Sequence, residues 1–177
     1  MVQELNSAKN GQNKKSNGNG RFMMTPEELE KKLTYLEDLE AIRYLHHEYM
    51  FRLNNRQWDD IIDSFVEDGS ANIGHHGLHQ GKAEVTNLFK EKIAKINPTG
   101  RRDAHFAIDP VITIEGDKAK GHWLMYIMIA NPRTGNVPGW TQGRHDCEYV
   151  KVNGEWKFKS VKYTRPWPIQ PDSVPKD

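Results

Sequence analysis

The segment DAHFAIDPVITIEGDKAKGHWLMYIMI, residues 103–129, contains two apolar runs joined by the turn-forming residues EGDK. Both runs are long and rich in β-branched and aromatic residues, which predicts two adjacent strands of a hairpin. If the first strand alternates regularly, its side chains divide between two faces. One face carries His105, Ala107, Asp109, Val111 and Thr113, and the other carries Phe106, Ile108, Ile112 and Ile114. The face that contains the histidine is the less apolar one, as expected for the lining of a pocket.

The rest of the second half has the same character. Four segments, 103–115, 119–130, 140–152 and 155–164, are separated by the turn signals EGDK, NPRTGNVPG and NG. Segments of this length with turn residues between them predict successive antiparallel hairpins.

The first half is helical in pattern. In TPEELEKKL, Thr25 can act as N-cap, Pro26 as the first helical residue and Glu28 as the second half of a capping box. Apolar residues then recur at helical spacing to about Arg52, and Tyr49 lies in phase with them. Shorter helices are predicted at QWDDIIDSF and KAEVTNLFKEKIAKI, with a short strand, GSANIG, between them. Three helices followed by a curled antiparallel sheet predict an α+β fold with the helices on one face.

Length and composition predict one domain. The chain has 177 residues, a net charge of +1 and one cysteine, Cys147. We expect a disordered polar tail at 1–22, a domain at 23–165 and an extended Pro-rich tail at 166–177. A basic arm for nucleic acid is the alternative role of the first tail. The near-neutral charge argues against nucleic acid and membrane partners, and the single cysteine favours a reducing, cytoplasmic location. No apolar run approaches the length of a membrane-spanning helix.

Several motifs occur in a characteristic order. They are LEDLEAIRYLHHEYMFRLNNRQWDDIIDSFVEDGSANIG, with the turn Phe65 to Gly69; the helix start Gly81 to Glu84; and the final hairpin Gly154 to Trp156. Over residues 25–165 the ordered set resembles the SnoaL-like branch of the nuclear transport factor 2-like superfamily. The resemblance implies a cone-shaped, curved antiparallel sheet packed on N-terminal helices, the cystatin-like α+β barrel, enclosing an apolar pocket. It also implies a homo-oligomer, a dimer or a trimer.

Within that branch the pattern is most similar to the bile acid 7α-dehydratases and, more distantly, to the scytalone dehydratases. The resemblance implies that His105 and Tyr49 form the catalytic pair. Where the bile acid enzymes carry two aspartates, this chain has Asn54 and Ile127. Elimination of water beside a carbonyl needs a base, an acid and a hydrogen-bond donor for the enolate. His105 suits the first two roles, and Tyr49 suits the third.

The expected pocket contains further side chains. Alternation places His145 and Asp146 on opposite faces, so only one of them can line the pocket. The candidate substrate-binding residues are Asn54, Trp58, Phe89, Trp123, Ile127 and His145. The histidine-rich loop HHGLHQG lacks a carboxylate or thiol at the usual zinc spacing, so we expect a surface loop and no metal. No phosphate-binding loop, dinucleotide fingerprint or nucleophile elbow occurs in the sequence, and no organic cofactor is expected.

These features predict a cofactor-independent lyase, a dehydratase that eliminates water from a hydrophobic, polycyclic or steroid-like hydroxy-carbonyl substrate by acid-base catalysis. Three alternatives remain open on the same scaffold. They are a non-catalytic protein that binds a small hydrophobic molecule, an isomerase or cyclase, and a structural subunit of a larger enzyme.

Overall fold

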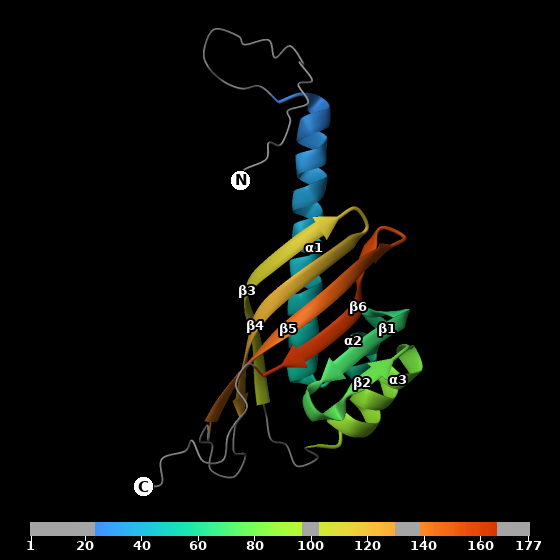
Figure 1. Ribbon diagram of the computed structural model, residues 1–177, viewed down its shortest axis with the longest axis vertical. Helices are drawn as coiled ribbons and strands as arrows, with labels where there is room; N and C mark the ends of the chain where they lie inside the picture. The colour runs from blue at the N-terminus through green and yellow to red at the C-terminus, as the bar shows by residue number, and fades with distance from the viewer. Residues whose placement is uncertain (1–23, 97–102, 130–138, 166–177) are drawn as a thin grey trace, which may run out of the picture.

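The computed structural model describes residues 24–96, 103–129 and 139–165. A long helix runs behind a curved sheet, and the short helices gather beside the C-terminal end of that helix (Figure 1). The predicted tails at 1–22 and 166–177 lie outside the described residues, as does most of the predicted turn NPRTGNVPG.

The long helix α1 spans Pro26–Asn55. Its predicted capping box is confirmed: the Glu28 N–H donates to Thr25 Oγ1 at 3.1 Å, and the Thr25 N–H donates to the Glu28 carboxylate at 3.0 Å. Side chains of α1 become buried only from Ile42 onward. The part of α1 before Asp38 therefore projects past the sheet, as Figure 1 shows, and leaves Leu29 and Leu33 exposed.

The short elements follow α1 in the chain. They are α2 (Trp58–Asp63), β1 (Phe65–Ile73), η1 (Gly74–His76), β2 (Leu78–Gln80), α3 (Lys82–Thr86) and the π-helical segment η2 (Asn87–Ile93). The second predicted helix ends earlier than expected, because Phe65 already belongs to β1. The third predicted helix is present but changes from α to π geometry at Asn87.

The four long strands match the four predicted segments. They are β3 (Asp103–Glu115), β4 (Lys118–Ile129), β5 (Gly139–Val152) and β6 (Glu155–Thr164). The sheet has six strands in the order β2-β1-β6-β5-β4-β3. β1 runs parallel to β6, whereas the other described pairs are antiparallel, so the sheet is mixed and not closed. The helices pack against this curved sheet, which confirms the predicted α+β class.

The prediction that side chains alternate regularly along β3 is wrong beyond Ile108. The pairing with β4 shifts between Ile108 and Val111, and Asp109 has a φ of 48°. Pro110 has no N–H to donate to a neighbouring strand, so a bulge at this point is favoured. The bulge returns Ile112 to the core side, together with Ala107, and leaves Val111 64% exposed on the outer face.

The core lies between α1 and the inner face of the sheet. Trp123 and Met125 of β4 are buried there, so the Trp123 side of this strand faces inward. None of the helices among the described residues is long and apolar enough to cross a membrane.

Candidate active site

A cavity of about 480 Å³ lies between the C-terminal end of α1, η2 and the inner faces of β3 to β6. Both predicted catalytic residues, Tyr49 and His105, line it. So do five of the six predicted substrate-binding residues: Asn54, Trp58, Phe89, Ile127 and His145. The sixth, Trp123, is fully buried behind the wall, where its ring stacks on His46 with centroids 4.0 Å apart. Residues far apart in the sequence thus meet around one cavity.

Asn54, in the last turn of α1, holds His105 through three hydrogen bonds. Its Nδ2 donates to the backbone oxygen of His105 at 3.0 Å, and its Oδ1 accepts from the His105 N–H at 2.7 Å. The same Oδ1 lies 3.0 Å from Nδ1 of the His105 ring. The first two bonds fix which end of the amide is oxygen, since a backbone carbonyl only accepts and a backbone N–H only donates.

This arrangement determines the tautomer of neutral His105. An amide oxygen can only accept, so Nδ1 must carry the proton. Nε2 of the neutral ring is then the basic nitrogen, and a general base needs such a lone pair. Asn54 is a neutral amide, so it orients the ring without adding a charge.

Tyr49 lies on α1 with 1% of its surface exposed. Its ring packs against Phe158 and Phe89, with centroid distances of 5.2 Å and 6.3 Å. Burial, with a smaller contribution from Cys147, raises the pKa of the Tyr49 hydroxyl well above its usual value. Tyr49 therefore remains a phenol at neutral pH and can act only as a neutral hydrogen-bond partner.

His145 lies on β5, opposite Trp123 of β4, with 3% of its surface exposed. Burial and the neighbouring charge of His105 lower the pKa of His145 to about 3, although Asp146 opposes the shift. Asp146 itself points to the other face, where it pairs with His122 at 2.6 Å and with Arg144 at 2.8 Å. The prediction that only one of the two neighbours faces the cavity is confirmed, and the one that does is a neutral imidazole.

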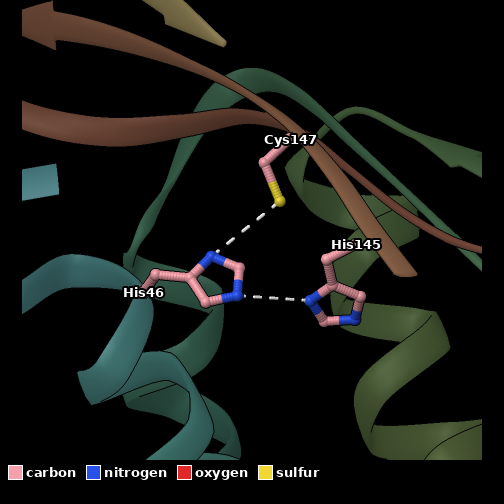
Figure 2. Close-up of side chains that lie close together, drawn as sticks. All are labelled: His46, His145 and Cys147. Atoms are coloured by element: carbon pink, nitrogen blue, oxygen red, sulfur yellow. Dashed lines mark hydrogen bonds between the residues drawn. The ribbon is translucent and has the colours of Figure 1, made fainter. Parts of the chain in front are cut away.

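A buried chain of hydrogen bonds leads to His145 from behind the cavity. The indole Nε1 of Trp123 donates to the Tyr149 hydroxyl at 2.9 Å, and that hydroxyl lies 2.9 Å from Nδ1 of His46. His46 Nε2 lies 3.4 Å from Nδ1 of His145. Figure 2 shows His46 of α1 between Cys147 and His145 of β5.

His46 and Tyr149 were not predicted from the sequence. His46 lies three positions before Tyr49, so both face the core on the same side of α1. A polar residue on the core-facing side of α1 was the available signal for a buried polar contact. It was obscured because Leu45, the neighbour of His46, fits the apolar stripe equally well.

His46, His145 and Cys147 are the described side chains that could hold a metal ion, with one potential ligand atom from each within 4.8 Å of the others. Both ring nitrogens of His46 already make hydrogen bonds, because Nδ1 contacts the Tyr149 hydroxyl and Nε2 contacts His145. Burial also raises the pKa of the Cys147 thiol, which keeps it protonated and a weak hydrogen-bonding group. We therefore describe the cluster as a hydrogen-bonded chain.

Tyr163 of β6 is a further residue of the cavity wall, and it was not predicted from the sequence. It is 8% exposed, and its hydroxyl has no hydrogen-bond partner within the described part of the chain. The ring lies across Gly143 of β5, where a Cβ atom would meet it at 2.2 Å. Only glycine leaves room for the tyrosine at this place.

The histidine-rich loop differs from the expected surface loop in one respect. His75 and His76 lie at the cavity wall, whereas His79 is buried on β2. Nδ1 of His79 is 3.1 Å from the Glu84 carboxylate, and Nε2 is 3.1 Å from Nζ of Lys92. These contacts attach the loop to the helix that follows it.

Comparison with known proteins gives matches in sequence and in fold. A family model described as the SnoaL-like domain matches residues 34–162. An NTF2-like protein with a cystatin-like fold from Novosphingobium aromaticivorans has a TM-score of 0.68 at 20% identity, covering 81% of this chain and 92% of that one.

Two further structures with the same fold carry the names of enzymes. A candidate scytalone dehydratase from Novosphingobium aromaticivorans has a TM-score of 0.65 at 20% identity, covering 77% of this chain and 89% of that one. A hexachlorocyclohexane dehydrochlorinase from Novosphingobium barchaimii has a TM-score of 0.65 at 16% identity, covering 77% and 91%. The predicted resemblance to the NTF2-like fold is confirmed. The similarity to the bile acid enzymes stays a prediction.

Proposed function

Because the chain belongs to the SnoaL-like domain family, we propose that it is a cofactor-independent lyase that eliminates water from a hydrophobic hydroxy-carbonyl compound. One observation carries the proposal: His105 is held by Asn54 with Nδ1 as the protonated nitrogen, in the wall of a cavity that it shares with Tyr49. A base with a fixed lone pair and a phenol donor in one cavity are the minimum equipment for enolisation.

The proposed reaction uses one base twice. Nε2 of His105 takes the proton from the carbon next to the carbonyl, while the Tyr49 hydroxyl donates a hydrogen bond to the oxygen on which charge develops. The protonated His105 then returns its proton to the departing hydroxyl group. A carbon–carbon double bond forms as the carbon–oxygen bond breaks, and one water molecule leaves.

The cavity supports a largely apolar substrate. Its walls include Trp58, Phe89 and Ile127, and its volume of about 480 Å³ lies within the range of small-molecule sites. The names of two structural relatives, a dehydratase and a dehydrochlorinase, both describe eliminations, of water and of hydrogen chloride. We propose a polycyclic or steroid-like compound as the substrate class.

The test is a comparison of wild type, His105→Ala and His122→Ala on a panel of sterols, bile acids and aromatic polyketide ketones. His122 is a control because it lies on β4 but faces away from the cavity. Mass spectrometry should show loss of one water with wild type and His122→Ala. Full turnover by a folded His105→Ala protein would rule out His105 as the base.

The neutral side chain of Asn54 favours a second candidate, a non-catalytic binding protein. An amide orients His105 but cannot stabilise its protonated form as a carboxylate would. This candidate predicts saturable binding of a panel compound to both wild type and His105→Ala, with the compound recovered unchanged after long incubation.

A further inference from the structure

His145 presents its second ring nitrogen away from the buried hydrogen-bonded chain. Nδ1 points to His46, and Figure 2 shows the other nitrogen, Nε2, on the opposite side of the ring. His145 is also part of the cavity wall that contains His105. Whether Nε2 carries a proton decides whether His145 donates to a ligand or accepts from it.

The chain behind His145 fixes the location of that proton. Trp123 Nε1 can only donate, so the Tyr149 oxygen accepts at that contact. The hydroxyl proton of Tyr149 is then directed to Nδ1 of His46, 2.9 Å away, because the other neighbour, the Cys147 sulfur, is a weak acceptor.

The assignment continues through His46. Its ring is fully buried, and burial with the nearby His145 and His47 lowers the pKa of His46 well below its usual value. A neutral ring that accepts at Nδ1 carries its proton at Nε2, and it donates this proton to Nδ1 of His145. His145, also neutral, must then carry its own proton at Nε2.

We propose that His145 donates a hydrogen bond from Nε2 to the carbonyl oxygen of the substrate, and that Trp123, Tyr149 and His46 are positioning residues that hold the proton there. The substrate class rests on the proposed function. The two cavity histidines then have opposite tautomers: Asn54 makes Nε2 of His105 an acceptor, and the buried chain makes Nε2 of His145 a donor.

A neutral imidazole suits this role. Burial keeps His145 from taking a second proton near neutrality, so it adds no charge that would repel a protonated His105. A donor already aimed at the developing charge needs no reorganisation during the reaction. His145 and Tyr49 would both donate a hydrogen bond to the carbonyl oxygen. Their ring centroids lie 6.0 Å apart.

The first experiment reads the tautomers directly. Long-range ¹H–¹⁵N correlation spectra of histidine-labelled full-length protein should show His46 and His145 neutral and protonated at Nε2 from pH 5 to pH 8, and neutral His105 protonated at Nδ1. Assignments come from the variants His46→Gln, His145→Gln and His105→Gln. A proton on Nδ1 of His145, which is the reversed direction of the chain, would overturn the proposal.

The second experiment measures the donor through binding. The probes are 2-acetylnaphthalene and 2-isopropylnaphthalene, which are similar in shape but differ in the carbonyl oxygen. Tyr149→Phe, which does not line the cavity, should reduce the preference for the ketone by about two- to tenfold, the factor of an ordinary net hydrogen bond. Tyr126→Phe, on the outer face of β4, is the matched control and should keep the preference.

These readouts separate the two proposals, because neither needs turnover. A protonated Nε2 on His145 that shifts when the ketone binds supports the donor even if no panel compound is converted. An unchanged ketone preference in a folded Tyr149→Phe protein would overturn it. A stoichiometric zinc ion in the purified protein that deprotonates Cys147 would also overturn it, because His46 and His145 would then be metal ligands.

Discussion

Oδ1 of Asn54 lies 3.0 Å from Nδ1 of His105, and the amide that carries it is locked by two further hydrogen bonds to the His105 backbone. One side chain at the end of α1 thus sets both the position and the tautomer of a histidine 51 residues away. The predicted base His105 therefore depends on Asn54, a position at which this chain differs from the pattern of the predicted resemblance.

Replacement of Asn54 tests that dependence. Asn54→Leu removes all three bonds and should lower kcat/KM by about 10- to 100-fold, a part of what a general base contributes. Asn54→Asp should raise the pKa of the His105 imidazolium, because a carboxylate stabilises the charged ring. The acidic limb of the pH profile of kcat/KM should then move to higher pH. Asn55→Asp is the control, since Asn55 bonds to the Phe51 carbonyl instead. An unmoved profile in Asn54→Asp would contradict the assignment.

Acid should destabilise the fold through His46 and His145. Burial lowers the pKa of both rings in the folded state, so the unfolded chain binds more protons below about pH 6.5, the ordinary histidine value. The contribution of the two histidines to the free energy of unfolding is fully present above that pH. It falls as the pH drops, by about 1.4 kcal/mol per pH unit for each histidine.

Urea denaturation of wild type, His46→Gln and the double variant with His145→Gln, between pH 6.5 and pH 4.5, measures this slope. Wild type should be the steepest, the single variant should lose about half of the histidine contribution, and the double variant should lose nearly all of it. Equal slopes in the three proteins would show that the two rings are not held neutral.

The local features of the fold were predictable from sequence. The capping box of Thr25 and Glu28 and the long strands depend on neighbouring residues, which a pattern can display. The parallel pairing of β1 with β6 is different, because it joins segments from opposite ends of the domain. The bulge at Asp109 had a signal in Pro110, but the sequence does not say whether a proline ends a strand or bulges it.

The candidate site was also predictable only in part, because a sequence pattern displays local features but not contacts between distant residues. Tyr49 and His105 were identified through the family pattern, and alternation predicted that His145 and Asp146 face opposite sides. The chain behind His145 was not predictable, because His46 meets its partners Tyr149 and His145 across 103 and 99 residues. Trp123 was predicted to line the pocket, whereas in the structure it faces inward but contacts His46 and not the cavity.

The hydroxyl of Tyr163 should cost stability. It is buried without a hydrogen-bond partner among the described residues, and such a group destabilises a protein by about 1–3 kcal/mol. Tyr163→Phe should therefore raise the free energy of unfolding by about 1 kcal/mol in chemical denaturation. Tyr149→Phe is the matched control and should lower it, since the Tyr149 hydroxyl bonds to both Trp123 and His46.

Gly143 tests the same packing from the other strand. A Cβ atom at this position would lie 2.2 Å from the Tyr163 ring, so Gly143→Ala must displace the ring. Overpacking of this kind costs about 1–3 kcal/mol. Combining Gly143→Ala with Tyr163→Leu should recover most of that loss, and a double variant as unstable as the sum of the two single variants would contradict the contact.

The outer face of the sheet bears on the predicted homo-oligomer. Apolar side chains adjoin one another there across β3, β4 and β5: Phe106, Ile108, Leu124, Tyr126, Met128 and Trp140. Trp140 is 61% exposed, and its ring centroid lies 6.0 Å from that of Phe106. A contiguous apolar patch on a protein surface marks a contact site more often than isolated residues do.

We expect a second copy of the chain to cover this face, as the family resemblance implies. Sedimentation equilibrium should give a dimer or trimer for wild type, and the double variant Phe106→Glu with Trp140→Glu should be a monomer, because two carboxylates would have to be buried without partners. Leu33→Glu, in the exposed half of α1, tells whether that helix adds to the same contact. A wild-type monomer at every soluble concentration would contradict the predicted assembly and leave this face for another partner.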